Sequence, residues 1–301
     1  PKLRSLMPAP KPTATAKDRL EYAIFVTLVS LLRVLPFRQR SALMAWIMTR
    51  VIAPLAGYTK RVHQNLDLIW PDMPRAEHNA LVTSVTRHTG RTICELFSPK
   101  DLTRMAKETP LKGPGLAALQ EAQTAGKPAI VISGHFGNYD IVRAALINKG
   151  FHVGGLYRRM NNTLIHKFYL NNISTIGTPL FERGRPGLGA MLRHLKDGGT
   201  LAALIDVRVN NGVPLPFLGQ PALTATSMAE LALRYGATLV PVYGIRSADA
   251  DHFTTYLDTA IPFTDPETMT RALNNSLEAR VRENPEQWFW IHNRWKGGTG
   301  G

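Results

Sequence analysis

The sequence has one cysteine, Cys94, and few charged or aromatic residues. A single cysteine cannot form an internal disulfide, and no Cys and His cluster has zinc-ligand spacing, so disulfide scaffolds and zinc modules are excluded. Hydrophobic residues make up 44% of the 301 positions and charged residues 19%. This composition can build a large core and excludes a disordered or collagen-like chain. The length fits one large α/β domain with an appendage.

Acidic side chains are scarce beside basic ones: 22 Asp and Glu stand against 36 Lys and Arg, for a formal net charge of +14. Such a charge favours an anionic partner, either nucleic acid, an acidic protein or a membrane surface. Eleven of the basic residues but only two of the acids lie in residues 1–61. The same stretch holds the two most apolar segments, Tyr22–Phe37 and Ala42–Gly57. We therefore expect this region to meet a membrane surface and no nucleic acid.

The chain also lacks a hydrophobic run long enough to span a bilayer cleanly. In Tyr22–Phe37, Thr27, Ser30 and Arg33 recur at a spacing of three and form a thin polar stripe on an apolar helix. Sixteen helical residues reach about 24 Å, short of the roughly 30 Å hydrocarbon thickness. A helix partly inserted at the cytoplasmic face is expected, with a buried helical hairpin as the alternative. A secretory signal is not expected, because Arg33 interrupts the apolar run.

Four regions follow from these patterns. Residues 1–17 read as a flexible basic tail, residues 18–100 as a helical membrane-associated lobe, residues 101–296 as an α/β domain, and residues 297–301 as a Gly-rich end.

From residue 128 onward, short β-branched runs alternate with helical stretches. Strands are predicted at Ala129–Ser133, His152–Arg158, Thr175–Glu182, Thr200–Val207, Thr238–Arg246 and Phe253–Ile261. Helices are predicted at Ala76–Leu96, Tyr139–Lys149, Gly187–Lys196, Thr226–Tyr235 and Pro266–Asn284. Alternation of this kind predicts an α/β fold with a mostly parallel central sheet flanked by helices.

The most informative local stretch is Ser133–Asp140, which directly follows the apolar run Ala129–Ile132 and opens a helix. His135 is therefore expected at the carboxyl end of a strand, where open α/β sheets place their ligands. Gly134 and Gly137 allow tight turns and a close approach of substrate to the backbone. Asn138 is assigned to the same substrate-binding turn.

An aspartate, Asp140, lies five residues after His135. Placed in the first helical turn, its carboxylate can accept the Nδ1 hydrogen and leave Nε2 free as a general base. Of the nine histidines only His135 has an acid at this spacing, but a short motif of this kind can arise by chance. The alternative is a helix-capping aspartate beside a solvated histidine.

Several ordered blocks resemble one family, the lipid A late acyltransferases, within the wider lysophospholipid acyltransferase group that shares an H-x4-D/E motif. Besides His135 and Asp140, the blocks are residues 56–71 (AGYTKRVHQNLDLIWP), 156–159 (LYRR), 217–222 (FLGQPA), 224–233 and 285–296 (PEQWFWIHNRWK). Together they cover about residues 20–296. The chain departs from the family where Asp206 is followed by Val207, and where the closing His-Arg-Arg is His292-Asn293-Arg294.

The resemblance implies transfer of a fatty acyl group from a thioester on acyl carrier protein or coenzyme A to a hydroxyl of a membrane glycolipid. His135 would act as the base and Asp140 would orient it. The oxyanion donors would be backbone amides of the Gly-rich turn or the guanidinium groups of Arg158 and Arg183, whose alternative role is that of surface arginines. Asp206 would take the part of the family's aspartate at the substrate site.

The same resemblance implies no metal and no cofactor, since a thiol leaves readily once the hydroxyl is deprotonated. A covalent acyl-enzyme is not expected, because Cys94 lies in the helical lobe and Ser133 lacks a nucleophile-elbow pattern.

The implied partners are an acidic acyl carrier protein, an anionic glycolipid acceptor and the cytoplasmic face of the inner membrane. Basic residues that could steer the anionic partners are Arg158, Arg159, Lys167, Arg183 and Arg185. General solubility is the alternative explanation of these charges.

Two other functions remain open. One is an acyltransferase that uses acyl-coenzyme A on another membrane lipid, such as a phosphatidylinositol mannoside or an amino-acid lipid. The other is a non-catalytic binder of anionic lipid, in which His135→Ala would leave function intact.

Overall fold

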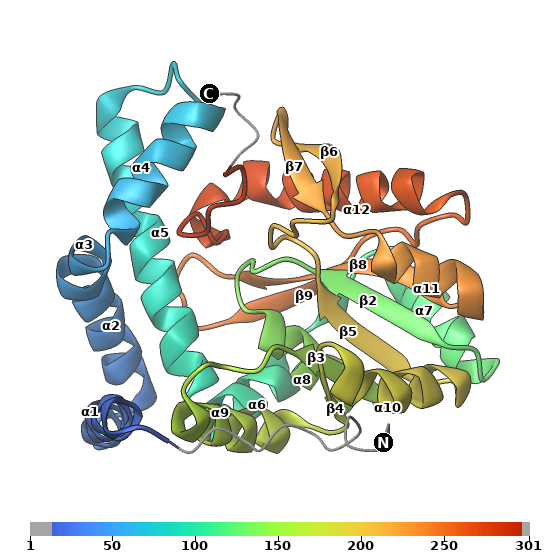
Figure 1. Ribbon diagram of the computed structural model, residues 1–301, viewed down its shortest axis with the longest axis horizontal. Helices are drawn as coiled ribbons and strands as arrows, with labels where there is room; N and C mark the ends of the chain where they lie inside the picture. The colour runs from blue at the N-terminus through green and yellow to red at the C-terminus, as the bar shows by residue number, and fades with distance from the viewer. Residues whose placement is uncertain (1–13, 297–301) are drawn as a thin grey trace, which may run out of the picture.

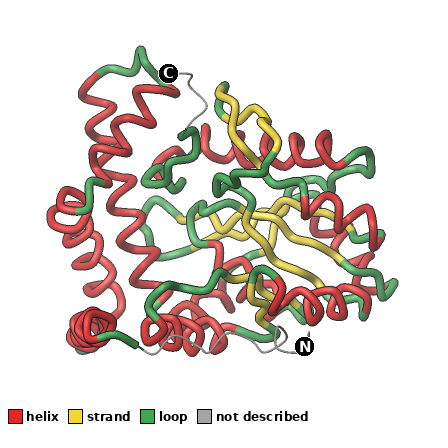
Figure 2. Tube along the Cα trace, viewed as in Figure 1, coloured by secondary structure: helices red, strands yellow, loops and turns green. Residues whose placement is uncertain are grey.

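A seven-stranded sheet runs through the centre of the molecule in the order β1-β9-β8-β2-β5-β3-β4, as the computed structural model of residues 14–296 shows (Figures 1 and 2). Its strands are β1 (Leu111–Lys112), β2 (Ala129–Ser133), β3 (Val153–Tyr157), β4 (Leu180–Glu182), β5 (Thr200–Leu204), β8 (Thr238–Arg246) and β9 (Phe253–Leu257). All neighbours are parallel except β8 and β9. The predicted α/β fold with a mostly parallel sheet is confirmed.

The central strand β2 explains how the two faces of the sheet are covered. All five of its residues are buried, and side chains alternate between the faces. Ala129 and Val131 belong to one core cluster, whereas Ile130 and Ile132 belong to another. A continuous apolar run is therefore what a strand covered on both sides requires.

Helices on the two faces complete these cores. The first face is covered by α6 (Pro99–Glu108), α7 (Gly115–Thr124) and α8 (Tyr139–Asn148), and the second by α10 (Arg185–Lys196), α11 (Ser227–Tyr235) and α12 (Pro266–Glu283). α9 (Thr163–Ile176) contributes Ile176 to the first core.

The N-terminal lobe is helical, as predicted, and stands beside the sheet in blue and cyan at the left of Figure 1. It consists of α1 (Ala16–Arg33), α2 (Phe37–Ile47), the π-helical segment η2 (Met48–Ile52), α3 (Ala53–Leu55), α4 (Tyr58–Ile69) and α5 (Arg75–Leu96). Val62 and Leu66 of α4 and Val85 of α5 pack in a third core with Trp288 and Trp290 from the end of the chain. The closing tryptophan block therefore joins the lobe to the α/β body.

The start of one predicted strand differs from the sequence prediction. The predicted strand Thr175–Glu182 begins in a helix, because the Asn162 side chain accepts hydrogen bonds from the amides of Leu164 and Ile165 and starts α9, which continues to Ile176. Only Leu180–Glu182 forms a strand.

An antiparallel hairpin of β6 (Val213–Phe217) and β7 (Gln220–Thr224) was not predicted. In addition, the apolar segment 22–37 is divided, because α1 ends at Arg33 and α2 starts at Phe37 after Pro36.

The domain boundaries stay predictions. Residues 1–13 of the expected basic tail and the Gly-rich end 297–301 lie outside the described residues. α1 starts at Ala16, where the Thr15 hydroxyl accepts a hydrogen bond from the Asp18 amide and the Asp18 carboxylate accepts one from the Thr15 amide.

Many of the large hydrophobic side chains exposed in the described part of the chain lie on the lobe. They are Leu20, Ile24, Leu31 and Val34 on and after α1, and Leu43, Trp46, Val51 and Leu55 from α2 to α3. Among residues 14–296, no single helix is both long and apolar enough to cross a membrane. One bent pair, Phe37–Leu55 with Tyr58–Ile69 at 84°, reaches that length and composition only when its two arms are taken together.

Candidate active site

Two neighbouring parallel strands bring His135 and Asp206 to the same edge of the sheet. β2 and β5 are in register with Ser133 opposite Leu204, so each of the two residues lies two positions beyond its strand. His135 is thus at the carboxyl end of β2, as the sequence predicts, and Asp206 meets it from β5.

The Asp206 carboxylate holds His135 at two points. Its Oδ2 accepts a hydrogen bond from the His135 backbone amide at 2.7 Å, and its Oδ1 lies 2.8 Å from the ring Nδ1. The indole Nε1 of Trp288 donates to the same Oδ2 at 3.0 Å. Because Nδ1 is hydrogen-bonded to Asp206, Nε2 is the ring nitrogen that is available to a substrate in the cavity that His135 lines.

The structure therefore corrects the partner expected for His135. Asp140 lies in the first turn of α8, but its carboxylate is 3.7 Å from the Arg143 guanidinium and forms no hydrogen bond with His135. The reason is the helix cap: the Asn138 side chain accepts from the amides of Asp140 and Ile141, which starts α8 after the turn that carries the histidine. Asp140 still lines the cavity.

The charges of the pair reinforce each other. Burial alone would lower the pKa of His135, but the attraction of Asp206, with a smaller one from Asp140, raises it above its usual 6.5. Burial would raise the pKa of Asp206, but His135 and then Arg294 outweigh it and lower the pKa. For Asp140, burial outweighs Arg143, and the pKa is raised. The lowered pKa of Asp206 favours its ionised form beside the imidazole.

Neighbouring rings and one glycine fix the imidazole. The Phe289 ring is stacked on His135 with centroids 5.1 Å apart, and Tyr139 meets it edge-on at 5.2 Å. A Cβ atom on Gly134 would lie 2.8 Å from the Leu277 side chain and 3.1 Å from the Asp206 Oδ2. A side chain at this position would therefore push Leu277 aside and crowd the Asp206 carboxylate.

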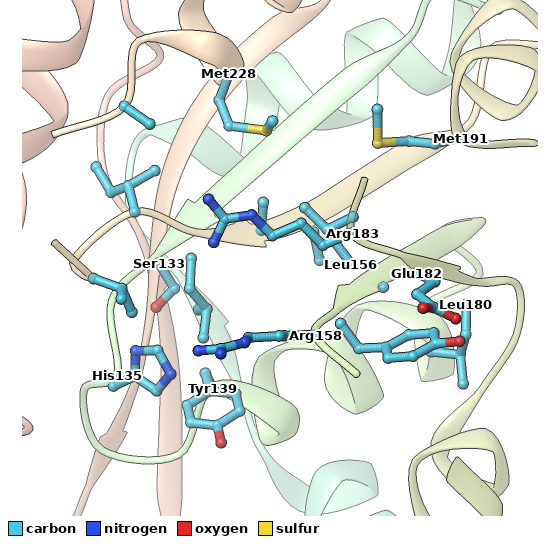
Figure 3. A pocket seen from close by; sticks show the side chains of 18 of the residues that line it. Ser133, His135, Tyr139, Leu156, Arg158, Leu180, Glu182, Arg183, Met191 and Met228 are labelled. Carbon is cyan, nitrogen blue, oxygen red and sulfur yellow. The ribbon is translucent and has the colours of Figure 1, made fainter. Parts of the chain in front are cut away.

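A cavity of about 870 Å³ opens beside His135 (Figure 3). Its polar wall includes Tyr139, Asp140, Tyr157, Arg158, Tyr169, Glu182, Arg183, Arg185 and Arg234, and its apolar wall includes Leu156, Leu188, Met191, Met228 and Leu231. Arg158 and Arg183 directly follow β3 and β4, and Figure 3 shows their side chains extending into the space beside His135 and Ser133. Both predicted arginines therefore line the site.

The three other residues assigned to the substrate turn do not line this cavity. Gly134 makes room for Asp206, and a Cβ on Gly137, which has φ of 52°, would meet the Gly244 carbonyl oxygen at 1.9 Å. The amides of Gly137 and Asn138 donate to the carbonyls of Gln287 and Gly244. These two backbone N–H groups already have acceptors within the protein. The guanidinium groups of Arg158 and Arg183 are therefore the better candidates for stabilising an oxyanion.

Sequence reasoning missed Trp288, Phe289 and His292 as parts of the site, although they lie in the closing block on which the resemblance depends. His292 lines the cavity, and its Nε2 accepts a hydrogen bond from the Arg208 amide at 3.1 Å. Burial lowers the pKa of His292.

Neither alternative nucleophile has an activated geometry. Burial raises the pKa of the Cys94 thiol to about 11. The Ser133 hydroxyl is buried without a hydrogen-bond partner in the described structure. Within residues 14–296, no group of three or more His, Cys, Asp and Glu side chains could hold a metal ion, and the expectation of a metal-free reaction stays a prediction.

An imidazole held by a buried carboxylate can take a proton from a hydroxyl, and a cavity with basic and apolar walls can hold an acyl chain next to that hydroxyl. The class that this fold and site define is the O-acyltransferases. The chain belongs to the bacterial lipid A biosynthesis acyltransferase family, whose sequence model matches residues 11–297.

Curated relatives agree with this assignment. The chain is 26% identical over 250 residues to the lipid A biosynthesis lauroyltransferase of Escherichia coli K12, covering 79% of this chain and 78% of the relative. It is 26% identical over 247 residues to a lipid A biosynthesis acyltransferase of Haemophilus influenzae, covering 77% and 76%. It is also 21% identical over 245 residues to the phosphatidylinositol mannoside acyltransferase of Mycobacterium tuberculosis H37Rv, covering 79% and 78%.

Proposed function

We propose that this enzyme transfers a fatty acyl chain from acyl carrier protein to a hydroxyl of a lipid A precursor, with His135 as the general base and Asp206 as the group that orients it. The observation that carries the mechanism is the double hydrogen bond between these two residues, of which His135 lines the cavity. The family assignment supports the substrate class.

The reaction needs one base and no covalent intermediate. Nε2 of His135 takes the proton of the acceptor hydroxyl as its oxygen attacks the thioester carbonyl, so that a C–O bond forms. Arg158 or Arg183 stabilises the oxyanion of the tetrahedral intermediate. The C–S bond then breaks, and the imidazolium returns the proton to the departing thiolate. Asp206 keeps the imidazole in the tautomer with hydrogen on Nδ1 and stabilises its charged form.

The two walls of the cavity suit the two substrates. The apolar side chains of Leu188, Met191, Met228 and Leu231 would surround the acyl chain. The arginines of the polar wall would attract the anionic glycolipid and, at the entrance, the acidic carrier protein.

We further propose that the enzyme works at the cytoplasmic face of the inner membrane, with the exposed apolar side chains of α1 to α3 in the bilayer interface. Leu20, Ile24 and Leu31 are spaced by four and seven residues, which places them on one face of α1. Exposed basic residues accompany these side chains, including Lys17 and Arg19 of α1 and Arg50 of η2. A surface that combines apolar and basic side chains matches an anionic membrane.

The decisive experiment supplies purified enzyme with a lipid A precursor and a panel of acyl carrier protein thioesters of different chain length. One acyl addition is expected by mass spectrometry of the lipid, with loss of turnover in His135→Ala. His194→Ala is a suitable control, because this buried histidine bonds to the Thr200 carbonyl oxygen and lies outside the cavity lining. Full activity of a folded His135→Ala variant would remove the mechanism and favour a non-catalytic lipid binder.

A second acceptor class deserves a parallel assay because relatives of the mycobacterial type act on phosphatidylinositol mannoside, as their name states. The same pair of residues would serve either acceptor. Acylation of the mannoside with acyl-coenzyme A, and none of the lipid A precursor, would select this alternative. No cofactor and no nucleic acid enter the proposal.

A further inference from the structure

A buried ion pair lies directly behind the turn that carries His135. Arg246, the last residue of β8, donates to the Glu95 carboxylate of α5 through both terminal nitrogens, with Nη2 to Oε2 at 2.7 Å. The two side chains are 0% and 1% exposed. The pair therefore connects the helical lobe with the sheet in a place that water does not reach.

Glu95 also holds the turn itself. Its Oε2 accepts a hydrogen bond at 2.7 Å from the side-chain amide of Asn138, a residue that is 2% exposed. The other end of that amide caps α8, and the Asn138 backbone amide donates to Gly244. The side-chain nitrogen, the side-chain oxygen and the backbone N–H of Asn138 all have protein partners. These contacts fix the chain three residues after His135.

A second arm connects the pair with Asp206. The backbone N–H and carbonyl of Arg246 form a reciprocal pair of 2.9 Å hydrogen bonds with the Gln287 side chain. The Gln287 carbonyl accepts from the Gly137 amide at 2.8 Å, and the next residue, Trp288, donates to Asp206. Both members of the catalytic pair therefore depend on the same support, His135 through Asn138 and Asp206 through Trp288.

Thr92 closes the network. Its hydroxyl accepts from Arg246 at 3.2 Å and donates to the Gly137 carbonyl at 3.0 Å.

The free energy of folding alone does not explain why the buried pair of Glu95 and Arg246 is charged. A buried ion pair is often no more stable than apolar side chains of the same volume, although loss of one partner is costly. What apolar side chains cannot supply is an acceptor for the Asn138 amide. We propose that Glu95 is a positioning residue for acyl transfer: held by Arg246, it fixes Asn138 and with it the position of His135 against Asp206. The inference rests on the proposed function of His135 as the base.

Paired variants separate positioning from stability. Glu95→Leu/Arg246→Met removes both charges and the acceptor, whereas Glu95→Gln/Arg246→Met removes both charges but keeps an oxygen for Asn138. Arg40→Met/Asp101→Leu is the matched control, because that pair joins α2 to α6, has side chains 11% and 24% exposed, and does not touch residues 134–138. All three are compared with the starting protein for melting temperature, kcat and KM.

Glu95→Leu/Arg246→Met is expected to remain folded and to lose about 10- to 100-fold in kcat with little change in KM, because a small displacement of a reacting group has this effect. Glu95→Gln/Arg246→Met is expected to recover most of the kcat, and the control to keep it. Equal kcat in the Leu and Gln variants would overturn the proposal, as would a fully active Leu variant.

Titration of His135 by NMR gives a readout that does not need substrate. The charged and titratable groups that face His135 and Asp206 come from several elements, and the Leu variant changes none of them. They are Tyr139 and Asp140 of α8, Arg158 after β3, Arg183 after β4, Tyr243 of β8, and His292 and Arg294 of the closing block. A looser contact with Asp206 should lower the pKa of His135 in that variant and shift the acid limb of kcat/KM with it. An unchanged titration would contradict positioning. Absence of acyl transfer by the unmodified enzyme would instead refute the proposed function.

Discussion

Asp206 accepts two hydrogen bonds from His135, one from the backbone amide at 2.7 Å and one from the ring Nδ1 at 2.8 Å, although 71 residues separate them in the chain. The first hydrogen bond fixes the position of the His135 backbone, and the second fixes the orientation of its imidazole ring. Asp140, only five residues away, acts on the imidazole across space without bonding to it. The two carboxylates should therefore be distinguishable by experiment.

Replacement of Asp206 by Asn should strongly reduce the rate of acyl transfer. The amide keeps the shape but loses the charge that selects the Nδ1–H tautomer, so kcat is expected to fall by roughly 1,000-fold or more, as for orienting aspartates of other histidine bases. Asp140→Asn leaves the hydrogen bond to Nδ1 intact and removes only the weaker attraction. NMR titration of His135 should show a larger fall in pKa for Asp206→Asn than for Asp140→Asn. The reverse order would restore Asp140 as the orienting group.

The pH dependence of the reaction follows from the same pair. The base must be neutral to accept a proton, and Asp206 raises the pKa of His135 above 6.5. Activity should therefore fall as the pH decreases through that raised pKa, and the acid limb of kcat/KM should have its midpoint above 6.5. In Asp206→Asn the attraction is lost while the burial that lowers the pKa remains, so the remaining activity should extend to lower pH. An acid limb that does not move between the two proteins would contradict His135 as the titrating base.

Several elements could be predicted because a local signal defines them. β2 is an apolar run that ends at Gly134, and α8 starts at a capping Asn138, so both were found within a residue or two. The hairpin β6–β7 was missed because Pro214, Pro216 and Pro221 lie in its strands, and proline cannot donate to a sheet ladder.

The site was predictable only in part for a different reason. The position of His135 follows from the strand that precedes it, but its partner depends on β5 lying beside β2, and strand order is not written in local sequence. The sequence motif indicated the nearer acid, whereas the sheet brings the distant one into contact. The buried support from Glu95 and Arg246 likewise depends on contacts between segments 151 residues apart.

Chain-length selection should respond to the apolar wall of the cavity. Met228, which lines it, is 9% exposed, and Met228→Trp would fill space that an acyl chain would occupy. Exclusion of two methylene groups costs about 0.8 kcal/mol each, or roughly tenfold in kcat/KM for the longest accepted donor. The preferred thioester in a competition assay should therefore become shorter. Met228→Leu, of similar volume, is the control, and an unchanged preference in both variants would place the acyl chain elsewhere.

Membrane attachment should depend on the exposed hydrophobic side chains of the N-terminal lobe and not on those exposed elsewhere on the protein. Trp46 and Leu55 are 57% and 84% exposed on α2 and α3, and Phe263, in the loop between β9 and α12, is 52% exposed. Burial of one such side chain in the bilayer interface contributes about 1.5–3 kcal/mol, so Trp46→Ser/Leu55→Ser should weaken partition into vesicles of anionic lipid by at least roughly tenfold. Phe263→Ser should have no such effect. Flotation with vesicles measures all three proteins, and equal partition of the double variant and the starting protein would show that a different surface meets the membrane.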